Sequence, residues 1–414
     1  KGDWESPSTG STRARVCSQT LDSTKSRRAA DSSRSFFLDT IEEQIQIRSR
    51  SICRRGRTMK RQFLNLVLGS HKTGSFSLRR IKTALFFHPK KQTVIPAPPA
   101  VMEVAELPEP TLSFGVPSAE RMMTMRFMPL GGSADKIVST DQDGTVMMYD
   151  ACENKLHVMP RLTGRIMRCP IPIAAGDALY LIEACPRATQ PDQPHCSSFR
   201  ALIHGDAPDG TASKPGWHWH PLPPPPYVEY SHYELEPSSG VRNRICSWAV
   251  VGDSIWVSSQ DGVGFRGIYA FDTTTREWKH VRSGEIPLLG RADHVTDRDR
   301  LFGFRFVSSE RNQLFCASGS GLEGETPDTV WEEEAPEQEH RGFELDLALA
   351  PGDWHSHRLA HLGSGRFCTA RFYHDDGERF AVFTGVEVDR GLNLVKHKSL
   401  RYNLDDDQPL HWVI

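Results

Sequence analysis

The feature that most constrains the fold of this chain is a repeated group of four short apolar runs separated by turns. The clearest copy, ICSWAVVGDSIWVSSQDGVGFRGIYAFDTTTREWKHV, spans residues 245–281. A Gly-Asp turn at Gly252–Asp253 joins its first two runs, and the segment DTTTRE joins its last two. Short apolar runs bounded by such turn residues are typical of strands, whereas long stretches with a period of 3.6 residues are nearly absent. One unit therefore predicts a four-stranded antiparallel sheet.

Other parts of the chain repeat the landmarks of this unit. Gly176–Asp177 occupies the same place in a second copy as Gly252–Asp253 does in the first. Further copies are recognised by their apolar runs, and they cover residues 169–223, 123–160, 291–318 and 366–404, with an opening hairpin at 61–81. The chain therefore contains about six units of one kind.

The turn before the fourth run also recurs. Leu156 follows Asp150 by six residues, as Trp278 follows Asp272 in the clearest copy. We expect Trp278 to be buried and structural, with its ring packed between adjacent sheets.

These repeats predict the fold class. A single four-stranded unit cannot bury both of its faces, so such units stack around a central channel. A repeat of about 50 residues with insertions is typical of kelch propellers. We therefore predict an all-β, kelch-like β-propeller of about six four-stranded blades, with a range of five to seven. A pair of β-sandwiches is the alternative, and the recurring landmarks argue against it.

The first part of the chain has a different composition. Residues 1–58 are rich in Ser and Arg and contain few apolar residues, so they cannot bury enough surface to offset the entropy of ordering. We expect residues 1–58 to be a disordered basic extension and residues 59–414 to form the propeller domain. We interpret Met59 as the start of the folded domain.

The distribution of charge bears on the partners. Residues 1–98 contain 20 Lys and Arg against 7 Asp and Glu, whereas residues 99–414 contain 30 against 45. Basic segments can neutralise nucleic-acid phosphates. We therefore expect no nucleic-acid binding except through the basic N-terminal segment.

Apolar and cysteine patterns bear on the compartment. No apolar run approaches the roughly 20 residues that span a bilayer, so we expect no association with a membrane. The 9 cysteines are irregularly spaced and form no C-x-x-C pair. Such scattered cysteines are typical of reduced thiols, which places the protein in the cytoplasm, the nucleus or both.

A family resemblance covers most of the chain. The segments MKRQFLNLVL, SFSLRRI, KIVSTDQDGTVMMYD, HLGSGRFCTARFY, FTGVEV and LVKHKSLRY follow one another between Met59 and Leu404. Together they resemble a plant family of unknown function, expanded in grasses, whose members are similar to kelch-type propellers and to the kelch halves of F-box proteins. We find no F-box-like helical segment ahead of the propeller. The resemblance implies a propeller and supplies no catalytic residues.

Histidine pairs are the best metal candidates. His218 and His220 are two residues apart, as are His355 and His357, and side chains at this spacing share one face of a strand. His361 follows the second pair. Because no paired Cys, Asp or Glu lies at a matching spacing, we predict no metal site. We also predict no cofactor and no catalytic residues.

The enzyme alternative remains open at this point. Kelch propellers include copper radical oxidases, which use Tyr, His and a crosslink between Tyr and Cys, and the chain has 8 Tyr and 9 Cys. A copper-oxidase-like enzyme or a glycan-binding propeller is therefore the alternative function. Gly363-Ser364-Gly365 lacks the G-x-S-x-G pattern, and we interpret it as a turn.

The longest departure from the blade pattern predicts a binding surface. Residues 205–243 contain a polyproline run at Pro223–Pro226, which is stiff and limits the entropy lost on binding. They also concentrate aromatic residues of the types enriched at interface hot spots. The predicted binding residues are Trp217, Trp219, Tyr227, Tyr230 and Tyr233. The alternative is that Trp217 and Trp219 pack between blades and the rest is a linker.

These observations predict a function of the scaffold class. We expect a monomeric, non-enzymatic scaffold or adaptor that holds an unidentified protein partner on the loops of a propeller, because the strands themselves are occupied by packing.

Overall fold

The structure is a computed structural model. It describes residues 61–89, 102–115, 125–131, 135–141, 143–163, 170–188, 197–206, 215–228, 243–260, 265–307, 310–318, 329–331, 343–344, 359–375, 378–405 and 410–414. Its contacts divide the chain into residues 1–58 and residues 59–414. The extension expected at residues 1–58 lies outside the described residues.

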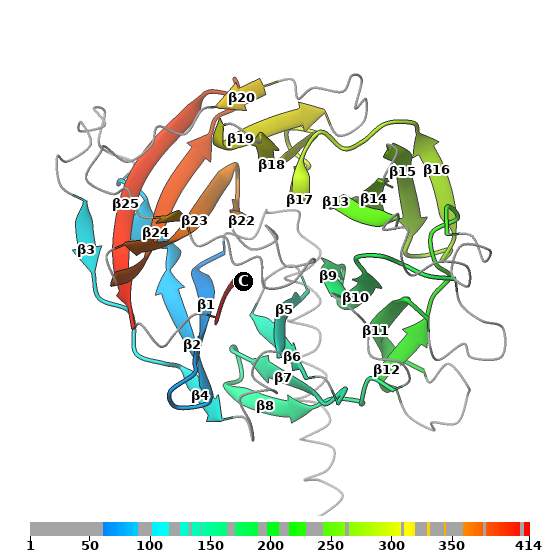
Figure 1. Cartoon of the computed structure of the whole chain (residues 1–414), viewed down its shortest axis with the longest axis horizontal. Helices are drawn as coiled ribbons and strands as arrows, with labels where there is room; N and C mark the ends of the chain where they lie inside the picture. Colours follow the sequence, from blue (N-terminus) through cyan, green and yellow to red (C-terminus); the bar gives the residue numbers. More distant parts are fainter. Residues whose placement is uncertain are drawn as a thin grey trace, which may run out of the picture. The chain divides into compact units, whose positions relative to one another are not determined.

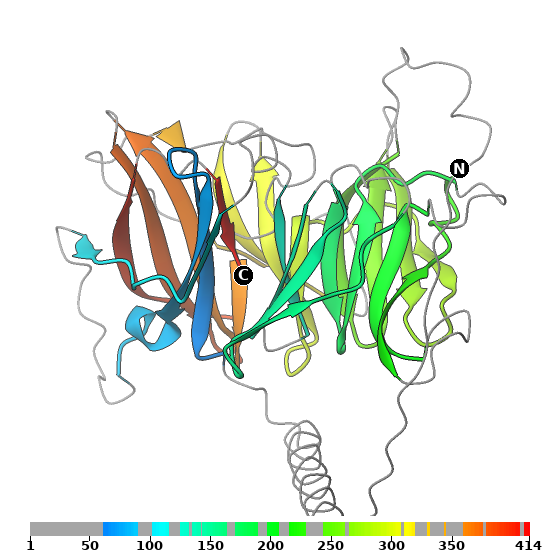
Figure 2. The same ribbon diagram turned by 90° about the horizontal axis from the view of Figure 1, so that it is seen from below.

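The described part of residues 59–414 is an all-β propeller, as predicted. Apart from one 3-10 helix, η1 (Thr83–Phe86), its regular elements are strands, and these form five hydrogen-bonded sheets. The sheets are arranged in a ring around a centre (Figure 1). Seen edge-on, the strands run roughly along the axis of that ring (Figure 2).

The sheets contain six four-stranded units among the described residues, which we number as blades 1 to 6. The strands are given from the centre outward. Blade 1 consists of β26 (Leu410–Val413), β1 (Phe63–Ser70), β2 (Ser75–Lys82) and β4 (Leu112–Gly115), and blade 2 of β5 (Arg126–Leu130), β6 (Lys136–Thr140), β7 (Val146–Asp150) and β8 (Lys155–Val158). Blade 3 consists of β9 (Pro170–Ala175), β10 (Ala178–Glu183), β11 (Phe199–Gly205) and β12 (Gly216–Pro221).

Blades 4 and 5 belong to one eight-stranded sheet. It forms because β13 and β17 pair in parallel between Ser247–Val250 and Gly290–Asp293. The strands are β13 (Arg244–Val251), β14 (Ser254–Gln260), β15 (Phe265–Asp272) and β16 (Trp278–Arg282), then β17 (Leu289–Val295), β18 (Arg300–Val307), β19 (Glu310–Ser318) and β20 (Thr329–Trp331). Counted as sheets the described propeller has five members, and counted as four-stranded units it has six. Both counts lie within the predicted range.

Blade 6 carries two additional strands. Its main strands are β22 (Leu359–Gly363), β23 (Arg366–Asp375), β24 (Glu378–Val388) and β25 (Leu394–Leu404), with β21 (Phe343–Glu344) also paired to β23 and β3 (Glu103–Ala105) paired to β25. β3 lies between β2 and β4 of blade 1 in the chain yet pairs in parallel with β25, so blades 1 and 6 are joined along their outer edges (Figure 1).

The ring is closed by strands from opposite ends of the propeller. β26 pairs with β1, and Leu66 lies opposite Val413. Beyond these pairs, the Ile414 N–H donates to the Asn65 carbonyl at 2.8 Å, and the Asn65 N–H donates to the Ile414 carbonyl at 2.9 Å. The innermost strand of blade 1 is thus supplied by the C-terminal segment.

The landmarks of the repeat have a physical role. Gly176 and Gly252 have φ values of 57° and 59°, a left-handed conformation that glycine adopts without steric cost, and each forms the turn between the first two strands of its blade. Asp150 and Asp272 form the later turn. The Asp272 carboxylate accepts the backbone N–H groups of Thr274 and Thr275, each at 2.8 Å, and Asp150 accepts two N–H groups in the same way.

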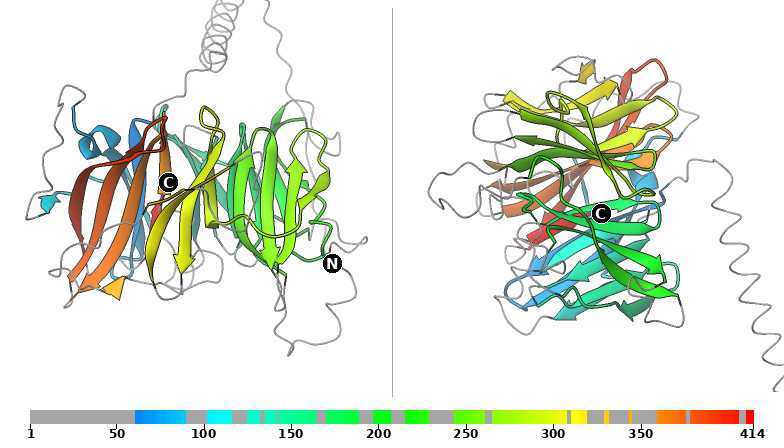
Figure 3. Two further views of the ribbon diagram at one scale, coloured as in Figure 1. Left: turned by 90° about the horizontal axis from the view of Figure 1, so that it is seen from above. Right: turned by 90° about the vertical axis from the view of Figure 1, so that its right-hand side faces the viewer.

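The core lies between neighbouring blades. All six residues of β10 are buried. Leu179 and Leu181 join a cluster shared with blade 2, whereas Tyr180 and Ile182 join a cluster shared with blade 4. Alternate residues of a strand point to opposite faces, so a strand covered on both faces has a continuous apolar sequence. Figure 3 shows the sheets of neighbouring blades facing one another.

Trp278 packs between blades as predicted, but it is half-buried rather than buried. Its ring lies 5.6 Å from that of Phe199 in blade 3 and 5.2 Å from that of Phe271 in its own blade. β16 is the outermost strand of its blade, so one edge of the indole remains near solvent. The turn predicted at Gly363-Ser364-Gly365 is present and connects β22 to β23.

Candidate interaction surface

Trp217 and Trp219 lie on β12, the outermost strand of blade 3. Both are half-buried and pack against the apolar cluster between blades 2 and 3. The Trp219 indole N–H donates to the carbonyl of Pro160, which follows the outermost strand of blade 2, at 2.9 Å. These two predicted binding residues therefore contribute to the packing between blades.

The polyproline run continues from β12 and is held against blade 4. The Trp278 indole N–H donates to the Pro223 carbonyl at 2.8 Å, and the Val228 N–H donates to the Pro225 carbonyl at 3.0 Å. Leu222 and Val228 are buried. The run is thus an ordered connection at the outer edge between blades 3 and 4.

Tyr227 begins a row of aromatic rings, packed at steep angles to one another, at this edge. Its ring lies 5.1 Å from that of Tyr269 on β15, and the Tyr269 ring lies 5.1 Å from that of His280 on β16. Tyr227 and Tyr269 are half-buried and His280 is exposed. Together with Trp278 these three residues form what we call the aromatic surface. Tyr230 and Tyr233, the remaining predicted binding residues, lie outside the described residues.

Sequence reasoning did not single out Tyr269 and His280. They lie directly opposite each other in the pairing of β15 with β16. A sequence signal existed, because both lie within the best-defined repeat unit. To recognise that these two residues lie next to Tyr227, one must know the register of β15 with β16 and the path of the polyproline run over these strands.

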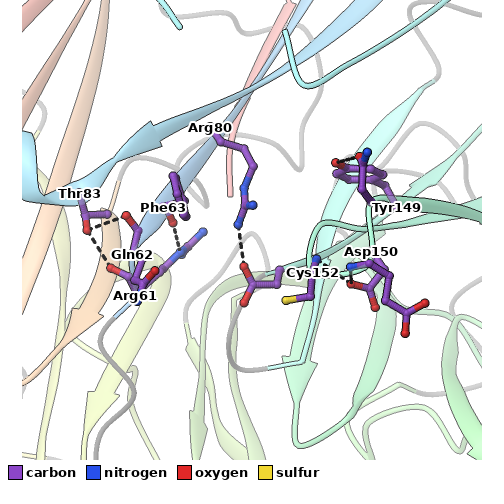
Figure 4. Close-up of polar contacts among 11 residues, drawn as sticks. Arg61, Gln62, Phe63, Arg80, Thr83, Tyr149, Asp150 and Cys152 are labelled. Carbon is purple, nitrogen blue, oxygen red and sulfur yellow. Dashed lines mark hydrogen bonds and ion pairs between the residues drawn. The ribbon is translucent and has the colours of Figure 1, made fainter. Parts of the chain in front are cut away.

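A second group of polar residues lies at the contact of blades 1 and 2 (Figure 4). The Arg80 guanidinium donates to the Asp135 carboxylate at 2.8 Å, which joins the two blades. The Thr83 hydroxyl contacts the carbonyls of Arg61 and Gln62 at 2.8 and 3.1 Å. These contacts fix the chain where it enters β1.

Arg61 connects this group electrostatically to the inner strands of blades 5 and 6. Burial, together with the charge of Arg291, lowers the pKa of Arg61 to about 10, and the charge of Asp293 opposes that shift. Burial also lowers the pKa of His361, again with Asp293 opposing. Asp293 is therefore within electrostatic range of both Arg61 and His361.

Each of these three side chains has an enclosed polar atom that no described group contacts through a hydrogen bond. The atoms are Arg61 Nη2, Asp293 Oδ2 and His361 Nε2. The other oxygen of Asp293 accepts two N–H groups of Arg291, at 2.7 and 2.9 Å. Enclosed polar atoms are normally satisfied by water or by a ligand, so this inner group is a second candidate site.

The histidine pairs do not form a common site among the described residues. His218 and His220 lie on β12 in blade 3, His361 lies on β22 in blade 6, and His355 and His357 are outside the described residues. In the part of the chain that the structure describes, no three His, Cys, Asp or Glu residues gather as a metal ion would require.

The cysteines in the described ranges are free thiols. Those whose side chains the structure describes are Cys152, Cys185, Cys246 and Cys368. Burial raises the pKa of Cys368 and of Cys246, which disfavours the nucleophilic thiolate. Cys152 is exposed, and burial of its sulfur together with the charge of Asp135 raises its pKa as well.

The ring of four-stranded units defines the chain as a β-propeller protein. Residues 61–402 match the family described as "Protein of unknown function (DUF1668)", and the chain belongs to this family. A comparison with functionally curated proteins gave no match.

Similarity to solved structures is distant. The extracellular domain of a putative one-component system from B. thetaiotaomicron is 9% identical with a TM-score of 0.30; the match covers 81% of this chain and 43% of that one. Apo AztD from Citrobacter koseri is 8% identical with a TM-score of 0.30, over 82% and 98%. The propeller domain of Cps50 (Swd1) from Myceliophteria thermophila is 10% identical with a TM-score of 0.27, over 55% and 62%. Within the described residues, no helix has the length and apolar character to cross a membrane.

Proposed function

We propose that this chain is a non-enzymatic, kelch-type propeller scaffold that binds a protein partner through the aromatic surface between blades 3 and 4. The observation that carries the proposal is the row of Tyr227, Tyr269 and His280, whose ring centres follow one another at 5.1 Å and reach solvent at His280. Tyrosine and tryptophan are enriched at interface hot spots because they supply a large contact area with few rotatable bonds.

The surface is ordered before any partner arrives. The hydrogen bond from Trp278 to Pro223 fixes the start of the polyproline run, and the Asn243 side-chain amide donates to the Tyr227 carbonyl at 3.4 Å. Groups that are already fixed lose little entropy on binding, so more of the contact energy remains as affinity. This order supports the proposal of a rigid recognition surface that includes Tyr227.

The cellular setting is part of the same proposal. We place the protein as a monomer in the cytoplasm or nucleus of a plant cell. Support comes from the family resemblance of the sequence and from the free thiols of the described cysteines, which suit a reducing compartment.

The test compares proteins captured by the full chain with those captured by a double variant, Tyr227→Ala with His280→Ala. Leu85→Ser is the matched control, because Leu85 is a 48% exposed apolar residue in η1, outside the aromatic surface. A true partner should be captured by the wild type and the control, and at least about tenfold less by the double variant. Equal capture by all three chains, at equal melting temperatures, would contradict the proposal.

The inner polar group favours a second candidate, a propeller that binds a small polar ligand such as a glycan. The observation behind it is the enclosed, uncontacted atoms of Arg61, Asp293 and His361. A guanidinium, a carboxylate and a neutral imidazole can together bind hydroxyl groups as donors and acceptors. Binding of sugars on a glycan array that is lost in His361→Leu would favour this candidate, and an array without any binding would exclude it.

A further inference from the structure

A short segment of the chain crosses from blade 1 to blade 6. It consists of η1 and the two residues after it, Phe87 and His88, and it follows β2 directly. At its start, the Thr83 N–H donates to the Gln62 carbonyl at 2.9 Å. β3, the next described strand, pairs with β25 at the outer edge of blade 6 (Figure 1). We call residues 83–88 the strap.

The strap is packed onto blade 6 by two phenylalanines. Phe86 is 0% exposed, and its ring lies 6.0 Å from that of Phe383 on β24. Its backbone lies so close over Gly385 that a Cβ atom there would collide with the Phe86 carbonyl. Phe87 is also buried, and the Arg366 guanidinium lies 4.6 Å from its ring centre. The glycine thus allows the strap to lie directly against the sheet.

His397 on β25 holds the end of the strap. The His88 backbone N–H donates to His397 Nδ1 at 3.4 Å, and the His397 ring lies 4.9 Å from that of Phe87 in an edge-to-face arrangement. A backbone N–H can only donate, so Nδ1 of His397 is the unprotonated nitrogen and Nε2 carries the ring proton. The His397 side chain is 10% exposed, so water has little access to replace this contact.

The groups around His397 favour its neutral form. Nε2 lies 3.4 Å from Oε2 of Glu387 on β24, but that oxygen already accepts an N–H of Arg366 on β23 at 2.7 Å. The His88 ring, in the strap itself, lies 5.8 Å from the His397 ring. Burial is the main influence and lowers the pKa of His397; Arg366 and His88 add to this shift, and Glu387 opposes it.

We propose that His397 is a pH-dependent latch, which keeps the strap on blade 6 while its Nδ1 is unprotonated and releases the strap when Nδ1 takes up a proton. Protonation removes the acceptor of the His88 N–H and places two donors opposite each other. The strap is therefore held fully above the ordinary histidine pKa of about 6.5, and it loosens as the pH falls below that value. Because the strap leads to β3, its release also loosens β3 on the edge of β25.

The test measures hydrogen exchange of the full chain by mass spectrometry at pH 7.5 and pH 5.5, with rates corrected for the intrinsic effect of pH on amide exchange. A released histidine is protonated about ten times as often as it is neutral at pH 5.5, so protection of the strap should fall about three- to tenfold. β10, in which all six residues are buried, is the reference and reports any loss that affects the whole propeller. Unchanged protection of the strap, or an equal loss in β10, would overturn the inference.

A variant assigns the effect to His397. His397→Asn keeps a side-chain oxygen near the place of Nδ1 and cannot be protonated there, so its strap should be equally protected at both pH values. His71→Asn is the matched control, because His71 is exposed in the turn between β1 and β2, and it should behave like the wild type. A loss in His397→Asn as large as in the wild type would refute the role of His397.

The wild type alone keeps the inference falsifiable if His397→Asn does not fold, since the comparison of the strap with β10 needs no variant. The inference concerns the closure of the ring and goes beyond the proposed function. None of these measurements involves the aromatic surface, so each result leaves the proposed function to its own test.

Discussion

At the scale of single residues, the propeller is held together by a recurring contact between a tryptophan and a proline. Trp219 and Trp278 each donate an indole N–H to the carbonyl of a proline that follows the outermost strand of the preceding blade, at 2.9 and 2.8 Å. Proline has no N–H, so it ends strand pairing at that edge while its carbonyl remains free to accept. The proline thereby ends the outermost strand of one blade and links that blade to the next one through its carbonyl.

This contact can be tested by removing the donor while keeping a ring. We expect Trp278→Phe to lower the free energy of unfolding by about 1–2 kcal/mol, since one hydrogen bond and part of the ring contact are lost. Trp219→Phe should cost a similar amount. Urea denaturation followed by circular dichroism measures both changes. Unaltered midpoints in both variants would show that the two hydrogen bonds contribute nothing to stability.

Stability should also depend on pH through His361. Burial lowers its pKa in the folded protein; Arg291 and Arg298 add to this shift, and Asp293 and Asp297 oppose it. The unfolded chain therefore binds the proton at a higher pH than the folded chain does. Stability is fully present above the ordinary histidine pKa of about 6.5 and is lost as the pH falls below it.

The check compares unfolding midpoints at pH 7.5 and pH 5.5 in the wild type and in His361→Phe. The phenylalanine keeps the ring contact with Phe367, which lies 5.0 Å away between ring centres, and cannot titrate. The variant should lose less stability than the wild type over this interval. Parallel losses in the two proteins would mean that His361 does not contribute.

At the scale of elements, local pattern identified the strands that pair with their sequence neighbours. β13 to β16 were readable because their turns carry Gly252 and Asp272. β3 and β26 were missed, since they pair with strands far away in sequence and their own sequences, EVA and LHWV, are too short to show a period.

The candidate sites were readable to different degrees for the same reason. Tyr227 stands out by composition, beside four prolines. Its neighbours Tyr269 and His280 become visible only when strand register is known. The inner group with Arg61 and Asp293 joins residues from distant parts of the sequence, which no local pattern connects.

The closing strand β26 should be essential for stability. Trp412 is 5% exposed, and its ring lies 5.8 Å from that of Phe76 in blade 1 and 5.0 Å from that of Phe127 in blade 2. Trp412→Ala should cost about 3–5 kcal/mol, because it leaves a cavity between two blades. Val104, on the outer strand β3, is 60% exposed, so Val104→Ala is the control and should change stability by less than about 0.5 kcal/mol. Similar losses in the two variants, measured by denaturation, would contradict a special role for the closing strand.

At the scale of the whole molecule, stability in this architecture is a sum of contacts between neighbouring blades plus the closure of the ring. Five of the apolar clusters each lie between two blades that are consecutive in the sequence, and a sixth lies between blades 6 and 1. Blades 6 and 1 are far apart in the sequence, so their contact is not made between sequence neighbours. Two strands link them: β26 follows blade 6 in the chain and pairs with β1, and β3 follows β2 of blade 1 and pairs with β25. Closure therefore depends on segments that lie near the two ends of residues 59–414.

The last prediction follows from where that closed ring begins. The Arg61 N–H donates to the Leu362 carbonyl in blade 6 at 3.1 Å, and β1 starts two residues later, so the described ring is complete from residue 61 onward. Residues 1–58 carry few apolar residues and no strand pattern. A chain that begins at Met59 should therefore melt at the same temperature as the full chain in differential scanning calorimetry. Since about 1 kcal/mol shifts the melting temperature of a large domain by only about 2 °C, a drop of more than a few degrees would show that the first 58 residues contribute packing to the propeller.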